Sequence, residues 1–136
     1  MAMVGRSASR RLLVQALYQH QISGHNRSVL HEQYINGREA VRADKPYFEL
    51  LLTEIMVSVD QLDQRIAVYA DRPVEQIDPI ERAVLWLGMT ELDLHPDLPA
   101  KVVMNEAIEL CRLFGSQDGY RYVNAVLDKA VKDIRS

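Results

Sequence analysis

The sequence predicts an all-α fold, a helical bundle of two packed three-helix subdomains. Three observations favour this fold class. Apolar residues recur at three- and four-residue steps through most of the 136 residues, as on one face of a helix. No segment combines sustained alternation with β-branched residues and a two-residue turn, as a β-hairpin would. Start and stop signals divide the chain into six expected helices, with a break near Pro73 after the third.

Two helices are expected at the amino-terminal end. The first spans about residues 9–23, because its apolar residues share one face and Gly24 follows as an end signal. The second spans about residues 28–36, where the apolar stripe is shorter. The stripe of the first helix consists of Leu13, Ala16, Leu17 and His20.

The third expected helix has the clearest pattern. Asp44 can accept hydrogen bonds from the first backbone N–H groups, and Pro46 is tolerated in a first helical turn. Apolar residues then recur as far as Tyr69, so we expect one unbroken helix that ends near Ala70. Such a helix would be about 40 Å long at roughly 1.5 Å per residue and would act as a spine.

The fourth expected helix has a strong start signal. Asp78 can cap it, Pro79 has the backbone angle of a first helical position, and Glu81 can complete a capping box. Residues 83–89 are apolar on nearly every side, which indicates that the helix is buried all round. Gly88 is unfavourable in a helix interior, so a close helix crossing is the expected reason for it.

Two helices complete the expected bundle. The fifth opens at about Pro99 and ends before Gly115, and the sixth starts between residues 116 and 120. Short loops make neighbouring helices antiparallel. We therefore expect one domain over residues 1–136, with subdomains at about 1–73 and 74–136.

The composition is that of an ordinary soluble protein, with 48% hydrophobic and 26% charged residues. The longest apolar run, residues 83–89, is far shorter than the roughly 20 residues that cross a bilayer, and no signal-peptide pattern is present. We expect a cytoplasmic protein without a membrane partner. Cys111 cannot form an internal disulfide, and its helical context favours packing over catalysis.

Charge is distributed unevenly along the chain. Residues 1–31 contain Arg6, Arg10, Arg11 and Arg27 and no acid, so this stretch carries +4 within a net charge of −3. The asymmetry predicts an anion-binding surface at this end, and the alternative is a merely solvated helix end.

The sequence contains no pattern typical of an enzyme. The histidines are scattered without the spacing of a zinc site, and no glycine-rich phosphate loop is present. We therefore expect no catalytic residue, no metal site and no cofactor.

The basic end can bind a phosphate chain. Unpaired N–H groups at a helix start, together with guanidinium groups, suit phosphate oxygens, and a series of phosphates is a nucleic-acid backbone. Single-stranded RNA also needs aromatic faces for its unstacked bases. Tyr120, Arg121 and Tyr122, beside Asp118, could supply them, although tyrosines at a helix start often have a packing role instead.

Several blocks of sequence occur together in order and carry a family resemblance. They are R-R-L-L-V-Q-A-L-Y-Q at 10–19, I-E-R-A-V-L-W-L-G-M-T-E-L at 80–92, N-E-A-I-E-L at 105–110, F-G at 114–115 and Y-V-N-A-V-L-D-K at 122–129. With them the chain resembles the NusB family of bacterial transcription antitermination factors. The resemblance covers nearly the whole length and is weakest over residues 25–42.

The resemblance implies a function and a set of site residues. NusB-like proteins bind the boxA segment of nascent ribosomal RNA together with ribosomal protein NusE, in a complex that lets RNA polymerase pass terminators. The implied RNA-binding residues are Arg6, Arg10, Arg11, Asp118 and Tyr122. The implied NusE-binding residues are Tyr18 and Glu81. The chain departs from the family where residues 7–9 interrupt the arginine run, and where Tyr122 replaces the usual phenylalanine.

Other readings of the sequence remain open. A similar helical domain precedes the catalytic domain of certain ribosomal RNA cytosine methyltransferases. Residues 1–136 show neither a cofactor-binding pattern nor a cysteine in catalytic context, so we expect no methyl transfer from them. A purely structural module would bind NusE and not RNA. The free protein is either a monomer or a homodimer that hides its basic face.

Overall fold

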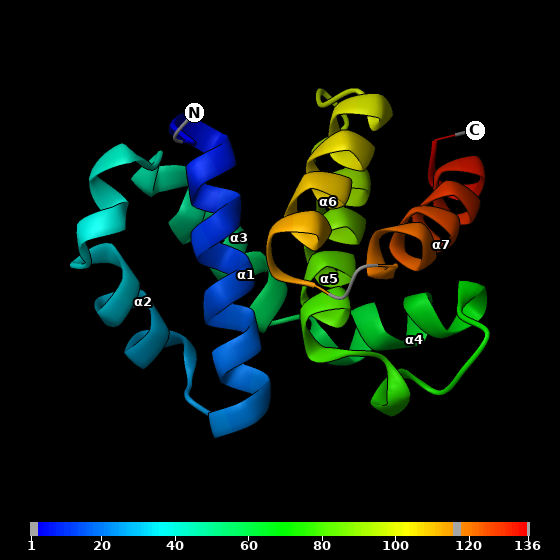
Figure 1. The fold of residues 1–136 in the computed structure, drawn as a ribbon, viewed down its shortest axis with the longest axis horizontal. Coiled ribbons are helices and arrows are strands. Elements are labelled where there is room, and N and C mark those ends of the chain that lie inside the picture. Colours follow the sequence, from blue (N-terminus) through cyan, green and yellow to red (C-terminus); the bar gives the residue numbers. More distant parts are fainter. Residues whose placement is uncertain (1–2, 116–117, 136) are drawn as a thin grey trace.

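The computed structural model describes residues 3–115 and 118–135, and within these residues it is helical with no strand (Figure 1). The expected all-α fold is therefore confirmed. The α-helices are α1 (Gly5–Ser23), α2 (Arg27–Ile35), α3 (Lys45–Met56), α4 (Val59–Tyr69), α5 (Pro79–Leu94), α6 (Ala100–Phe114) and α7 (Gly119–Ile134). The short 3-10 helices are η1 (Arg38–Arg42) and η2 (Val74–Gln76).

Helix α1 begins earlier than the sequence predicts. The expected start near Ser9 is wrong, because Ser9 does not cap the helix. Its hydroxyl donates instead to the carbonyls of Gly5, at 3.2 Å, and Asp44, at 2.7 Å. The end of α1 is as predicted, since Gly24 adopts a left-handed conformation with φ of 72°.

The prediction of a single long helix over residues 44–70 is wrong, because the chain forms two helices there. Helix α3 ends at Met56, and Ser58 has a non-helical backbone with ψ of 16° at the start of α4. Figure 1 shows α4 running across the lower end of α5, away from the direction of α3. Leu62 and Ile66 of α4 continue the apolar spacing of α3 and are buried, so the periodicity does not reveal the turn.

Helix α5 lies at the centre of the molecule and packs against α1, α3, α4, α6 and α7. Its predicted cap is confirmed: Asp78 accepts hydrogen bonds from the N–H groups of Ile80, at 2.9 Å, and Glu81, at 3.2 Å. Residues 83–92 of α5 are all buried. A Cβ on Gly88 would lie 3.0 Å from a methyl group of Leu127, so α7 crosses closely there, as expected.

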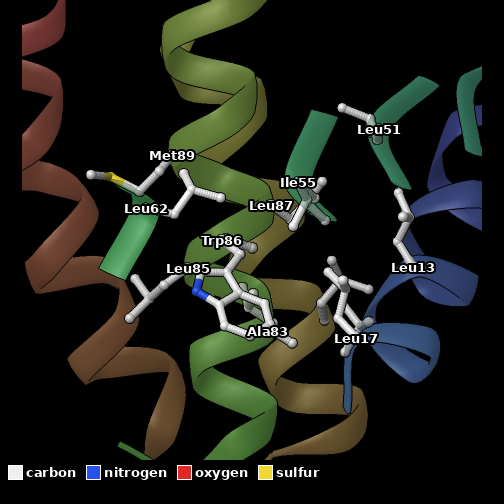
Figure 2. Packing of buried hydrophobic residues seen from close by; sticks show 14 of the residues in the cluster. Leu13, Leu17, Leu51, Ile55, Leu62, Ala83, Leu85, Trp86, Leu87 and Met89 are labelled. Carbon is white, nitrogen blue, oxygen red and sulfur yellow. The ribbon is translucent and has the colours of Figure 1, made fainter. Parts of the chain in front are cut away.

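The buried core is continuous across the helices. Figure 2 shows Trp86 and its neighbours on α5 between side chains of α1, α3 and α4. Trp86 is 1% exposed and donates to Asp63 at 2.8 Å, so it packs in the core and links α5 to α4. Helix α4 precedes Pro73 yet packs on α5 and α7 as well as α3. The division into subdomains at 1–73 and 74–136 stays a prediction.

Two further features bear on function. Within residues 3–115 and 118–135, no helix combines the length and apolarity that crossing a bilayer demands. Helix α7 begins at Gly119, inside the expected interval of 116–120, of which residues 116 and 117 lie outside the described residues.

Candidate nucleic-acid interface

Arg10 is not a surface residue, although the sequence predicted that it meets RNA. It is 3% exposed, and its Nε donates to Glu91 Oε2 at 2.8 Å. Its second partner is Glu106, at 3.3 Å. Burial alone would lower the pKa of Arg10, but the charge and hydrogen bond of Glu91 raise it above its ordinary value. These partners give Arg10 a structural role, and its contact with RNA stays a prediction.

Other side chains complete this buried polar cluster. The hydroxyl of Tyr47 donates to the same oxygen of Glu91, and the hydroxyl of Ser7 donates to Glu106 at 2.7 Å. The cluster joins α1 to α3, α5 and α6. A buried charge needs this kind of compensation, because its desolvation is costly.

Arg6 and Arg11 remain available at the surface. Arg6 is exposed, and its guanidinium lies 4.3 Å from the ring centroid of Tyr47. The Arg11 side chain is 38% exposed and lies 5.8 Å from the ring centroid of Phe114. Both arginines project from the first turns of α1, so the predicted basic end exists with two of its three family arginines.

Two arginines that sequence reasoning did not single out lie beside Arg11. A cavity of about 260 Å³ between α1 and η1 is lined by Arg11, Arg38, Arg42, Glu39, Met3 and Ala8. Arg38 and Arg42 fall in the region where the family resemblance is weakest. The available signal was the pair of arginines four residues apart, R-x-x-x-R, between the second and third expected helices.

Tyr122 lies on the first turn of α7, in contact with Arg72. The guanidinium of Arg72 covers its ring at 4.2 Å from the centroid. The Tyr122 hydroxyl is buried without a hydrogen-bond partner among the described residues, and burial raises its pKa. No hydrogen bond or cation–π contact in the described part of the chain joins Tyr122 to Arg6 or Arg11. The structure therefore does not gather the predicted RNA-binding residues into one contact cluster.

The start of α7 carries a second aromatic group with arginines around it. The ring of Tyr120 lies 4.7 Å from the guanidinium of Arg112 and 5.6 Å from that of Arg121. A hydrogen bond from Arg121 holds the pKa of Tyr120 below its ordinary value. Asp118 is exposed and lies 3.8 Å from Arg121. This group can offer both a stacking face and positive charge to an unpaired base.

Tyr18 and Glu81, which the family resemblance assigns to NusE binding, differ in exposure. Tyr18 is 40% exposed and lines an open depression of about 580 Å³ together with Ile22, Ile80 and Phe114. Glu81 is only 6% exposed, next to Ile80 at the start of α5. The structure thus brings Tyr18 and the α5 start to one surface, with Glu81 lying inward from it.

Neither a metal-ligand group nor an accessible thiol is present among the described residues. They contain no group of three His, Cys, Asp or Glu side chains that could hold a metal ion. Cys111 is fully buried, and this burial raises the pKa of its thiol to about 12. Such a thiol is a poor nucleophile near neutral pH.

Known proteins resemble this chain along most of its length. The model of the NusB family matches residues 7–132. The transcription antitermination protein NusB of Shewanella amazonensis is 41% identical over 126 residues, which are 93% of this chain and 94% of the relative.

Solved structures resemble it in fold. A structure of T. maritima NusB is 24% identical and covers 96% of this chain and 94% of its own, with a TM-score of 0.82. The crystal structure of antitermination factors NusB and NusE in complex with dsRNA contains a chain that is 19% identical, with a TM-score of 0.81. That match covers 93% of this chain and 96% of the other.

Proposed function

Because the chain belongs to the NusB family, we propose that it is an RNA-binding transcription antitermination factor. Its proposed ligand is boxA-type single-stranded RNA of ribosomal RNA operons, bound together with ribosomal protein NusE. The proposed setting is the antitermination complex of RNA polymerase. One solved structure of this fold holds NusB with NusE and dsRNA, which supports NusE and RNA as the classes of partner.

The observation that carries the proposal is the pair of exposed arginines at the start of α1. Arg6 and Arg11 have guanidinium groups at the surface, whereas Arg10 is neutralised inside the protein. Guanidinium groups suit phosphate oxygens because they donate two parallel hydrogen bonds. Phosphate contacts supply affinity, and base selection then needs groups such as Tyr120 and Tyr122.

The proposed NusE-binding surface is the depression around Tyr18. Ile22 and Ile80 add apolar area to it, and the hydrogen bond from Gln21 to the carbonyl of Pro79, at 2.8 Å, fixes α1 against the start of α5. Glu81 then contributes by shaping this helix start, because its side chain is largely buried. Asp118, an exposed residue just before α7, stays a proposed RNA neighbour.

We propose no catalytic activity and no cofactor, and a cytoplasmic site of action. The buried, unreactive Cys111 supports the first point, since it removes the one cysteine from methyl-transfer chemistry. A scaffold that binds NusE without RNA is the second candidate, and the burial of Arg10 is the observation that favours it.

A titration of labelled RNA separates these candidates. BoxA-type RNA is titrated with the protein, with and without NusE, at two salt concentrations. We expect binding that is strengthened by NusE and weakened by salt, because each phosphate contact releases counterions. If the chain binds NusE but RNA binding is not detected with or without NusE, the scaffold is favoured.

A further inference from the structure

We propose that the cavity between α1 and η1 is a phosphate-binding site in which Arg38 and Arg42 act with Arg11. Its ligand would be the phosphodiester backbone of the bound RNA. This inference rests on the proposed function and extends its RNA surface from the start of α1 onto η1. The site is lined by Arg11, Arg38, Arg42, Glu39, Met3 and Ala8.

The two arginines of η1 are held on a fixed frame. Ala40, between them, is 1% exposed and anchors η1 in the core. The N–H of Asp44 donates to the carbonyl of Gly5 at 3.2 Å, and Ser9 donates to the carbonyl of Asp44 at 2.7 Å. These bonds fasten the end of η1 to the first turns of α1. Arg38 and Arg42 therefore lie at set positions beside Arg11, which reduces the entropy lost on binding.

The balance of charge in the cavity favours an anion. Three guanidinium groups line it against one carboxylate, that of Glu39. Glu39 Oε2 lies 4.0 Å from Arg11 Nε, beyond hydrogen-bonding distance, and accepts a long bond from Gln15 at 3.4 Å. Glu39 therefore offsets only part of the positive charge.

An unused donor also points to a ligand. The Nε atom of Arg11 is buried, yet within the described residues it donates to no acceptor. Buried polar groups are nearly always hydrogen-bonded, so this donor needs an acceptor that the described residues do not supply. A phosphate oxygen that enters the cavity would supply it and would meet Arg38 and Arg42 at the rim.

The chemistry of the donors selects a phosphodiester. Guanidinium forks match phosphate geometry, and arginines at fixed spacing can follow a strand from one phosphate to the next. Arg6 lies on the first turn of the same helix as Arg11, so a strand that passes the start of α1 would continue over η1.

The test compares variants that remove positive charge with a variant that removes negative charge, each in the complete complex. BoxA-type RNA is titrated with the full chain and NusE, using Arg38→Gln/Arg42→Gln, Glu39→Gln, and, as a control, Arg27→Gln at the start of α2. We expect the double variant to bind at least about tenfold more weakly. Its log–log salt slope should fall by about 1.4, since each single-strand contact contributes about 0.7. Glu39→Gln should bind more tightly, an outcome that a folding defect cannot produce.

The remaining outcomes distinguish failure of this site from failure of the proposed function. Unchanged affinity and slope in the double variant, with wild-type binding intact, would overturn this site and leave the proposed function standing. Absence of RNA binding by the wild type would overturn the proposed function itself. In a further arm, inorganic phosphate is titrated while the Nε–H signals of the arginines are followed by NMR. Saturable shifts at Arg11 that RNA does not displace would indicate a free-phosphate site and contradict an RNA backbone site.

Discussion

Arg10 and Glu91 form an ion pair in the protein interior, with Nε and Oε2 2.8 Å apart and both side chains at most 3% exposed. The neighbouring Arg11 leaves the same helix toward solvent. One arginine thus holds α1 against α5, and the next is free to bind an anion.

Removal of Glu91 should destabilise the protein strongly. Glu91→Ala leaves the Arg10 guanidinium buried without its main partner, and we expect a loss of about 3–5 kcal/mol in the free energy of unfolding. Asp93→Ala is the control on the same helix, because its exposed pair with Arg65 should contribute about 1 kcal/mol or less. Urea unfolding followed by circular dichroism measures both. Equal losses for the two variants would contradict a structural role for Arg10.

Alkaline pH should weaken the same cluster. Burial and the hydrogen bond to Glu91 raise the pKa of Tyr47 above its ordinary value of 10.0. In the unfolded chain Tyr47 loses its proton near pH 10, whereas the folded protein still holds it, so the stabilisation is present below this pH and is lost above it. Unfolding curves between pH 8 and 11 should show a steeper decline for the wild type than for Tyr47→Phe. Parallel declines would contradict the assignment.

Cys111 should be unreactive in the folded protein. Burial raises its thiol pKa to about 12, so the thiolate is scarce at neutral pH and the sulfur is enclosed. We expect a thiol reagent such as DTNB to label the native protein far more slowly than the urea-unfolded protein. Labelling at the same rate in both states would show that the α6 environment is open.

The hydroxyl of Tyr122 should be dispensable for stability. It is buried and has no partner among the described residues, so its removal restores no lost bond and relieves a desolvation penalty. Tyr122→Phe should leave the free energy of unfolding unchanged or raise it by up to about 1 kcal/mol. Tyr122→Ala, which deletes the packed ring, should lower it. A clear loss in Tyr122→Phe would reveal a hydrogen bond at this hydroxyl.

Local chemistry made much of the fold predictable. The start of α5 follows from the Asp78-Pro79 pair, and burial on every side follows from the apolar run after it. The turn between α3 and α4 could not be predicted, because buried residues such as Ile55 and Leu62 keep the apolar spacing across it. Tertiary packing of α4 across α5 decides the direction of the chain there.

The site was less predictable, because its members depend on contacts between distant residues. Arg10 meets Glu91, which is 81 residues away, and no local pattern reveals that pairing. A signal did exist, since Arg10 precedes Leu13 and Leu17 by three and seven residues and so shares their buried face. Arg38 was missed because η1 joins Arg11 only through the folding of the chain.

The most direct test of the account is the RNA affinity of Arg11→Glu beside Arg27→Glu, each measured with NusE and paired with an unfolding curve. Arg11→Glu should weaken RNA binding by about 1–3 kcal/mol while stability changes little, because its guanidinium serves the ligand and not the core. Arg27→Glu should bind as the wild type does. Undiminished RNA affinity in Arg11→Glu would contradict the claim that the start of α1 is the RNA-binding surface.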